Sequence, residues 1–173
     1  RQIWKSIMKL DHIAYRVKDR KETAQFFKSL FGYEIGAEFD IEFDDGSKAD
    51  CYALVPPTSP VLMIREGPEI FVSDGSPGSI VGDWVVSRNG IGGIHHMAYN
   101  TKKIDSVVEQ WRGAGVKFLT ESVIDCPEDD LRQIFTKPLD HLGGVIIELI
   151  QRGKKGFCQN SVKNLMESTK ELK

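Results

Sequence analysis

A repeated eight-residue segment is the feature that most constrains this 173-residue chain. Residues 10–17, LDHIAYRV, resemble residues 94–101, IHHMAYNT, and the two segments start 84 residues apart (94 − 10). Their residue character alternates with a period of two, which is typical of a β-strand with two different faces. Because self-similarity at a fixed offset indicates a duplicated supersecondary unit, the sequence predicts two copies of one module.

The segments that follow each copy predict the same order of elements, one helix and three strands. In the first half these are expected at 19–31, 33–42, 49–55 and 61–65, and in the second half at 104–113, 116–120, 132–136 and 145–151. The predicted fold class is therefore α+β, with two β-α-β-β-β modules and a C-terminal helix in one domain. The expected boundaries are module one at about 8–66, a linker at about 67–92, module two at about 93–152 and the helix at about 160–172.

Composition and charge argue against several classes of protein. The formal net charge is −2 and hydrophobic residues make up 40%, so neither a disordered chain nor an electrostatic nucleic-acid binder is expected. No apolar run approaches the length of a membrane span, and the first residues lack the apolar core of a signal peptide. Cys51, Cys126 and Cys158 are odd in number and lack CxxC spacing, which argues against a disulfide framework. We expect a cytoplasmic protein with a small-molecule partner, binding neither nucleic acid nor membrane.

Three residues form a candidate metal site. His12 and His96 occupy the same position in the two copies of the repeat, and Glu148 lies in the apolar run GVIIELI, where an unpaired carboxylate is costly to bury. A single histidine in a strand is more often a packing or surface residue, and a single glutamate is more often paired or exposed. The matched pair with a carboxylate nevertheless favours a metal. Two imidazoles and one carboxylate suit Fe(II), although Mn, Co, Ni or Zn can bind the same donors. His95 is expected on the opposite strand face, either as a residue that supports a metal ligand or as a packing residue.

These residues resemble the vicinal oxygen chelate superfamily, in which paired β-α-β-β-β modules form a curved half-barrel around one metal. Two longer segments, RQIFTKP at 132–138 and IELIQR at 147–152, resemble the catalytic C-terminal domain of 4-hydroxyphenylpyruvate dioxygenase. The resemblance implies that His12, His96 and Glu148 are iron ligands.

The same resemblance implies roles in substrate binding for Gln133, Phe135 and Phe157, each of which has an alternative role in packing. It implies a non-haem Fe(II)-dependent dioxygenase that uses a 2-oxo acid and dioxygen. Arg65 is a candidate for binding a carboxylate or phosphate, or else a solvated strand end. Several pocket positions depart from the dioxygenase pattern, so a substrate other than 4-hydroxyphenylpyruvate is expected; these are Ile80, His95, Ile146 and Val162.

The alternative is a metal-dependent isomerase of the methylmalonyl-CoA epimerase or glyoxalase type. Such members of the superfamily usually add a fourth ligand, Glu or Gln, from the first module. Glu148 follows His96 by 52 residues (148 − 96), which places the equivalent position near 64, where Leu62, Met63 and Ile64 offer no ligand. We therefore expect the oxygenase. A metal-free drug-binding protein is a third class. The substrate, the metal and the formation of a homodimer are left open by the sequence.

Overall fold

The computed structural model describes residues 7–172, apart from the side chain of Asp129. Each half of the chain has the element order β-α-β-β-β-α, so the α+β class, the two modules and the C-terminal helix are confirmed. The chain divides into two compact units, which we call the N-terminal unit (residues 12–96 and 169–172) and the C-terminal unit (residues 7–11 and 97–168). Residues 1–6, where we expected no leader, lie outside the described part. Among the described helices, none has the length and apolar character needed to cross a membrane.

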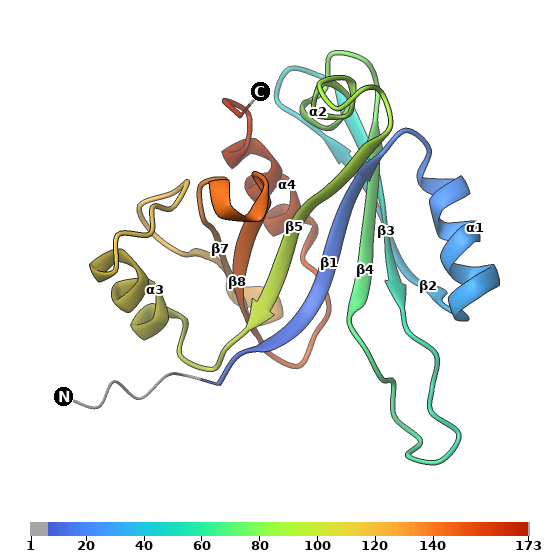
Figure 1. Cartoon of the computed structure of the whole chain (residues 1–173), viewed down its shortest axis with the longest axis horizontal. Coiled ribbons are helices and arrows are strands. Elements are labelled where there is room, and N and C mark those ends of the chain that lie inside the picture. The colour runs from blue at the N-terminus through green and yellow to red at the C-terminus, as the bar shows by residue number, and fades with distance from the viewer. Residues whose placement is uncertain (1–6, 173) are drawn as a thin grey trace. The chain divides into compact units, whose positions relative to one another are not determined.

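The first module supplies most of the N-terminal unit (Figure 1). Its elements are β1 (Lys9–Val17), α1 (Arg20–Phe31), β2 (Glu34–Glu42), β3 (Lys48–Val55), β4 (Glu69–Gly75) and α2 (Ile80–Val86). The strands lie in the order β2-β3-β4-β1. The pairs β2-β3 and β3-β4 are antiparallel, whereas β4 and β1 are parallel.

Helix α1 covers one face of this sheet (Figure 1). The helix begins after Asp19, whose carboxylate accepts hydrogen bonds from the backbone N–H groups of Lys21 and Glu22, and it ends at Gly32, which has a φ of 72°. Ala24 and Phe27 of the helix pack against apolar side chains of β1, β3 and β4, which are Ile13, Tyr15, Val17, Tyr52, Leu54, Ile70 and Val72.

The opposite face of the sheet, which we call the inner face, carries the polar residues of interest. Because side chains alternate along a strand, this face holds the residues between those that contact α1. They are His12, Ala14 and Arg16 of β1 and Glu69, Phe71 and Ser73 of β4. The ring of Phe71 lies 6.5 Å from that of His12 and 6.1 Å from that of Phe39 on β2, which places all three on the same face.

The position predicted for the fourth strand, 61–65, is wrong. The apolar run at 61–64 lies in an exposed loop beyond the ends of β3 and β4, where Met63 has a φ of 53° and is 77% exposed (Figure 1). The strand instead occupies Glu69–Gly75, inside the segment expected as a linker, which also contains α2. An apolar run of this length does not by itself distinguish a buried strand from a loop.

The second module supplies most of the C-terminal unit. Its elements are β5 (Gly92–Asn100), α3 (Ile104–Gly113), β6 (Ile124–Cys126), β7 (Leu131–Phe135), β8 (Ile146–Arg152) and α4 (Gln159–Ser168), with short 3₁₀ helices at Pro127–Asp129 and Asp140–Leu142. Strands β6, β7 and β8 are antiparallel neighbours. Helix α3 packs Val107 and Val108 against Ile134 and Leu149 of this sheet. The strand predicted at 116–120 is wrong, because that segment forms only an isolated bridge at Phe118.

A disulfide joins Cys126 of β6 to Cys158, the residue before α4. The prediction that the cysteines form no disulfide is therefore wrong, and Cys51 is the remaining cysteine. The odd number and wide spacing of the cysteines were weak arguments against a disulfide, because pairing depends on which cysteines the fold brings together. Disulfides persist mainly in oxidising compartments, so the cytoplasmic expectation loses the support that the cysteines gave it.

Candidate functional site

The two histidines of the repeat lie together in the N-terminal unit. His12 is 1% exposed on the inner face of β1, and His96 lies on β5. Their ring centroids are 5.5 Å apart and the rings meet edge to face at 80°. The duplication therefore brings two imidazoles to adjacent positions, which is the arrangement that the repeat predicted.

His95 contacts His96 directly, so the prediction that the two rings lie on opposite faces is wrong. Their Nδ1 atoms are 2.8 Å apart, which requires one ring to donate and the other to accept a hydrogen bond. The strand also begins irregularly, since Gly92 and Gly93 have φ values of 78° and 155°. Burial, the charge of Arg16 and the neighbouring imidazole hold the pKa of His95 well below its ordinary value. His95 thus orients the ring of His96 through Nδ1, and Nε2 is the second ring nitrogen of His96.

Glu148 is a buried carboxylate in the C-terminal unit. It is 1% exposed on β8, and Gln133 of β7, equally buried, donates a hydrogen bond from Nε2 to Glu148 Oε1 at 2.7 Å. Phe135 is the strand partner of Glu148 and is also buried. A carboxylate that is buried this deeply needs hydrogen-bond donors or a cation at its oxygens, and carboxylate oxygens are common ligands of divalent metals. The structure gives Gln133 a role in orienting Glu148, whereas its predicted contact with substrate stays a prediction.

Phe157 and Arg65, the other predicted substrate residues, have local partners. Phe157 lies under the guanidinium of Arg152 at 4.4 Å, and Arg152 in turn pairs with Asp11 at 2.5 Å. Arg65 donates to the carbonyl oxygen of Pro56 at 2.6 Å, and its side chain is 46% exposed. These contacts show structural roles, and the ligand contacts of both residues stay predictions.

Glu69 is a candidate that the sequence argument missed. It is the partner of His12 in the parallel pair β1-β4, so both side chains project from the inner face. The search for a fourth ligand counted 52 residues from His12 and therefore stopped in the exposed loop, five positions short of Glu69 (69 − 64). Correct placement of β4 would have found this carboxylate.

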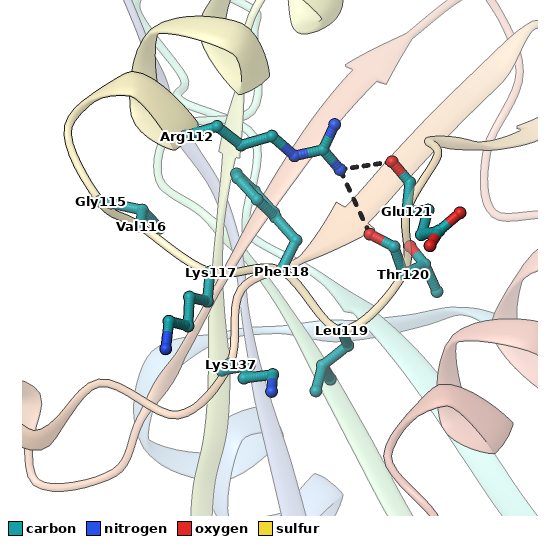
Figure 2. Close-up of a pocket in the computed structure, with 9 residues that line it drawn as sticks. All are labelled: Arg112, Gly115, Val116, Lys117, Phe118, Leu119, Thr120, Glu121 and Lys137. Carbon is teal, nitrogen blue, oxygen red and sulfur yellow. Dashed lines mark hydrogen bonds between the residues drawn. The ribbon is translucent and has the colours of Figure 1, made fainter.

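An open hollow of about 770 Å³ lies beside α3 in the C-terminal unit, and no predicted site residue lines it (Figure 2). Arg112 lines this hollow, and its guanidinium donates hydrogen bonds to the backbone carbonyl oxygens of Thr120 and Glu121. Figure 2 shows Lys117 and Lys137 pointing away from Arg112 and Phe118, so the positive charges do not converge on one point. The residues that line this hollow therefore give no support for a catalytic site there.

Comparison with known sequences identifies a family. Residues 11–135 match the family described as the glyoxalase/bleomycin resistance protein/dioxygenase superfamily. An ethylmalonyl-CoA/methylmalonyl-CoA epimerase from Cereibacter sphaeroides is 29% identical over 145 residues, which cover 84% of this chain and 98% of that protein.

Solved structures of two kinds share the fold. A methylmalonyl-CoA epimerase superposes with a TM-score of 0.67 at 25% identity, covering 87% of this chain and 99% of its own. A triple mutant of 4-hydroxymandelate synthase from Streptomyces coelicolor superposes with a TM-score of 0.77 at 24% identity, covering 94% of this chain. The match spans only 54% of the synthase, and at this level of identity it shows the fold alone.

Proposed function

Because the chain belongs to the glyoxalase/bleomycin resistance protein/dioxygenase superfamily, we propose that it is a metal-dependent epimerase that moves a proton at the α-carbon of an acyl thioester. The similarity to an ethylmalonyl-CoA/methylmalonyl-CoA epimerase over 98% of that protein supports this reaction. The observation that carries the proposal is the position of Glu69 opposite His12. It removes the argument for an oxygenase, which rested on the lack of a fourth ligand.

In this proposal His12, Glu69, His96 and Glu148 are the protein ligands of one divalent metal. Glu69 and Glu148 each lie on the last strand of a module, as His12 and His96 each lie on the first. The residues fit a metal because the two imidazoles are adjacent, Glu148 is buried, and imidazole nitrogens and carboxylate oxygens are the usual protein ligands of divalent metals. Two nitrogen and two oxygen donors suit Mn, Co, Ni or Zn. When bound, the ion would supply Lewis-acid polarisation of the thioester carbonyl, which makes the adjacent C–H group more acidic.

The two carboxylates are also the proposed proton carriers. Epimerisation removes a proton from one side of a carbon and returns a proton on the other side, so two groups must exchange protons. Glu69 and Glu148 come from equivalent strands of the two modules and can serve the two sides. The hydrogen bond from Gln133 holds the Glu148 carboxylate in one orientation, and His95 does the same for the ring of His96.

Hydrogen exchange tests this function. Purified protein loaded with Co²⁺ is incubated anaerobically with methylmalonyl-CoA in D₂O, and deuterium at the α-carbon is measured by mass spectrometry. We expect metal-dependent exchange that falls by at least about 100-fold in Glu69→Gln and in Glu148→Gln, the range typical of a lost acid–base group. Glu66→Gln is the matched control, because Glu66 is exposed in the loop before β4, and it should retain the wild-type rate.

The second candidate function is the Fe(II)-dependent dioxygenase, which the resemblance of residues 132–138 and 147–152 to 4-hydroxyphenylpyruvate dioxygenase favours. It predicts oxygen uptake by the Fe(II)-loaded protein with aromatic or branched 2-oxo acids. Oxygen uptake that needs Glu148, together with no deuterium exchange into any acyl-CoA, would overturn the epimerase proposal. Failure to bind any divalent metal would exclude both functions.

A further inference from the structure

Arg16 is a buried positive charge that forms no ion pair with an acidic residue among residues 7–172. It lies on the inner face of β1 and is 3% exposed. Its Nη2 donates to the hydroxyl of Thr169 at 3.1 Å, and its guanidinium lies 5.9 Å from the ring centroid of Trp84. Within residues 7–172, Nη1 has no hydrogen-bond acceptor. Burying a charge among neutral partners is unfavourable, because the lost hydration is not replaced by an opposite charge.

Arg20, four residues further along the chain at the start of α1, shows how this protein neutralises an arginine elsewhere. Its Nη1 lies 3.2 Å from Asp74 and 3.4 Å from Asp50, and its guanidinium stacks on Tyr52. Arg16 has no such arrangement. Burial lowers the pKa of Arg16 to about 9, and the charge of Arg88 acts in the same direction.

In the part of the chain that the structure describes, a second arginine lies near Arg16 and no carboxylate forms an ion pair with it. The guanidinium of Arg88 lies 3.9 Å from the ring centroid of Trp84, so two arginines contact the same indole. In the described part of the chain, Arg88 donates only to the hydroxyl of Ser87. Ser73 is the strand partner of Arg16, and Cys51 is the partner of Ser73 on β3. Burial raises the pKa of the Cys51 thiol, so this group is neutral at physiological pH.

We propose that Arg16, together with Trp84 and Arg88, forms a binding site for the carboxylate group of a small ligand. A guanidinium presents paired N–H donors that match the two oxygens of a carboxylate, and an anion there would give Nη1 an acceptor and neutralise the buried charge. A carboxylate suits this buried position better than a phosphate, which is larger and more strongly hydrated. The site goes beyond the proposed epimerase function and does not depend on a bound metal.

The position of this site relates it to the histidine pair. Trp84 contacts the ring of His95 at 5.3 Å, and His95 is bonded to His96. His12 and Arg16 project from the same face of β1 with Ala14 between them, about 13 Å apart at a rise of about 3.3 Å per residue. The carboxylate site therefore adjoins the histidines proposed to bind metal. One molecule could place its carboxylate at Arg16 while another part of it lies beside these histidines.

Anion binding to metal-free protein tests the proposal. Chelator-treated wild-type protein is titrated with malonate, acetate and phosphate by isothermal calorimetry, and thermal unfolding is followed with each anion. We expect saturable binding of malonate with a rise in Tm of a few degrees, because a ligand that binds only the folded state stabilises it. Arg16→Met should weaken malonate binding at least tenfold and remove the saturable rise. Arg20→Met is the matched control and should keep the malonate response while lowering Tm.

Stability without anion separates binding from a structural role. Met fills a similar volume without charge, so Arg16→Met should have a Tm equal to or above that of the wild type when no anion is present. An equal malonate response in wild type and Arg16→Met would refute the site. A variant that unfolds or loses as much Tm as Arg20→Met would indicate a structural arginine and would also refute it. Arg16→Lys should restore part of the malonate affinity. Saturable binding of phosphate but not of malonate would overturn the assignment to a carboxylate.

Discussion

The disulfide between Cys126 and Cys158 makes the most direct test of the fold of the C-terminal unit. It joins β6 to the residue that precedes α4, and both cysteines are buried with Ala98, Leu131 and Ile150. Reduction would leave the start of α4 attached to the sheet only by packing and hydrogen bonds. We therefore expect the reduced protein to remain folded but to be clearly less stable.

The size of the effect follows from the length of the closed loop. The cysteines are 32 residues apart in sequence. The chain-entropy relation gives about 4 kcal/mol at 25 °C for a loop of this length. For a chain of this size, roughly 2–4 °C of Tm corresponds to each kcal/mol, so the expected fall is on the order of 10 °C.

Thermal unfolding with and without a reducing agent measures this fall, and a peptide map under non-reducing conditions identifies the bonded cysteines. The double variant Cys126→Ser/Cys158→Ser should unfold near the Tm of the reduced wild type and should not respond to the reducing agent. Free thiols at both positions in the map, or a change in Tm below about 2 °C on reduction, would refute the reasoning. A disulfide that involves Cys51 would refute the pairing itself.

Two further predictions concern an ion-pair network and a helix contact. Arg132 pairs with Asp105 and Asp125 at 2.6 Å, and because these carboxylates are 73% and 55% exposed, Arg132→Met should lower the free energy of unfolding by less than about 1 kcal/mol at pH 7. Arg132 holds the pKa of Asp105 below its ordinary value of 3.8. This contribution is therefore present above pH 3.8 and is lost as the pH falls through the lower pKa of the folded state, so the urea midpoints of variant and wild type should converge as the pH is lowered through that range. A Cβ on Gly82 would overlap the carbonyl oxygen of Ser76, so Gly82→Ala should destabilise by roughly 1–3 kcal/mol in urea unfolding. Gly113 in α3 has open space around it, so Gly113→Ala should instead stabilise by about 0.5–1 kcal/mol, and equal effects at both glycines would contradict the packing of α2.

Features set by local sequence could be predicted, and features set by distant contacts could not. Helix α1 was placed correctly because Asp19 and Gly32 mark its ends through bonds within the same few residues. The repeat predicted that His12 and His96 occupy equivalent positions, and the structure places their rings together. The disulfide joins residues that only the tertiary fold makes neighbours, so the spacing of the cysteines carried no information about it. The contact between the rings of His95 and His96 departs from regular strand alternation, so the alternation rule could not predict it.

The misplaced fourth strand had the largest consequence, because the proposed function depended on it. Counting residues from His12 assumes that both modules have loops of equal length. The loop before β4 is longer than that assumption allows, and its exposed apolar residues, which include Leu62 and Met63, imitate a strand. Pairing in a sheet is insensitive to such insertions, because the register of β1 with β4 sets Glu69 opposite His12 whatever the length of the connection. A ligand in a duplicated fold is therefore found from strand register and not from sequence distance. For this chain, that difference changes the expected ligand set from three residues to four, and the preferred reaction from oxygen activation to proton transfer.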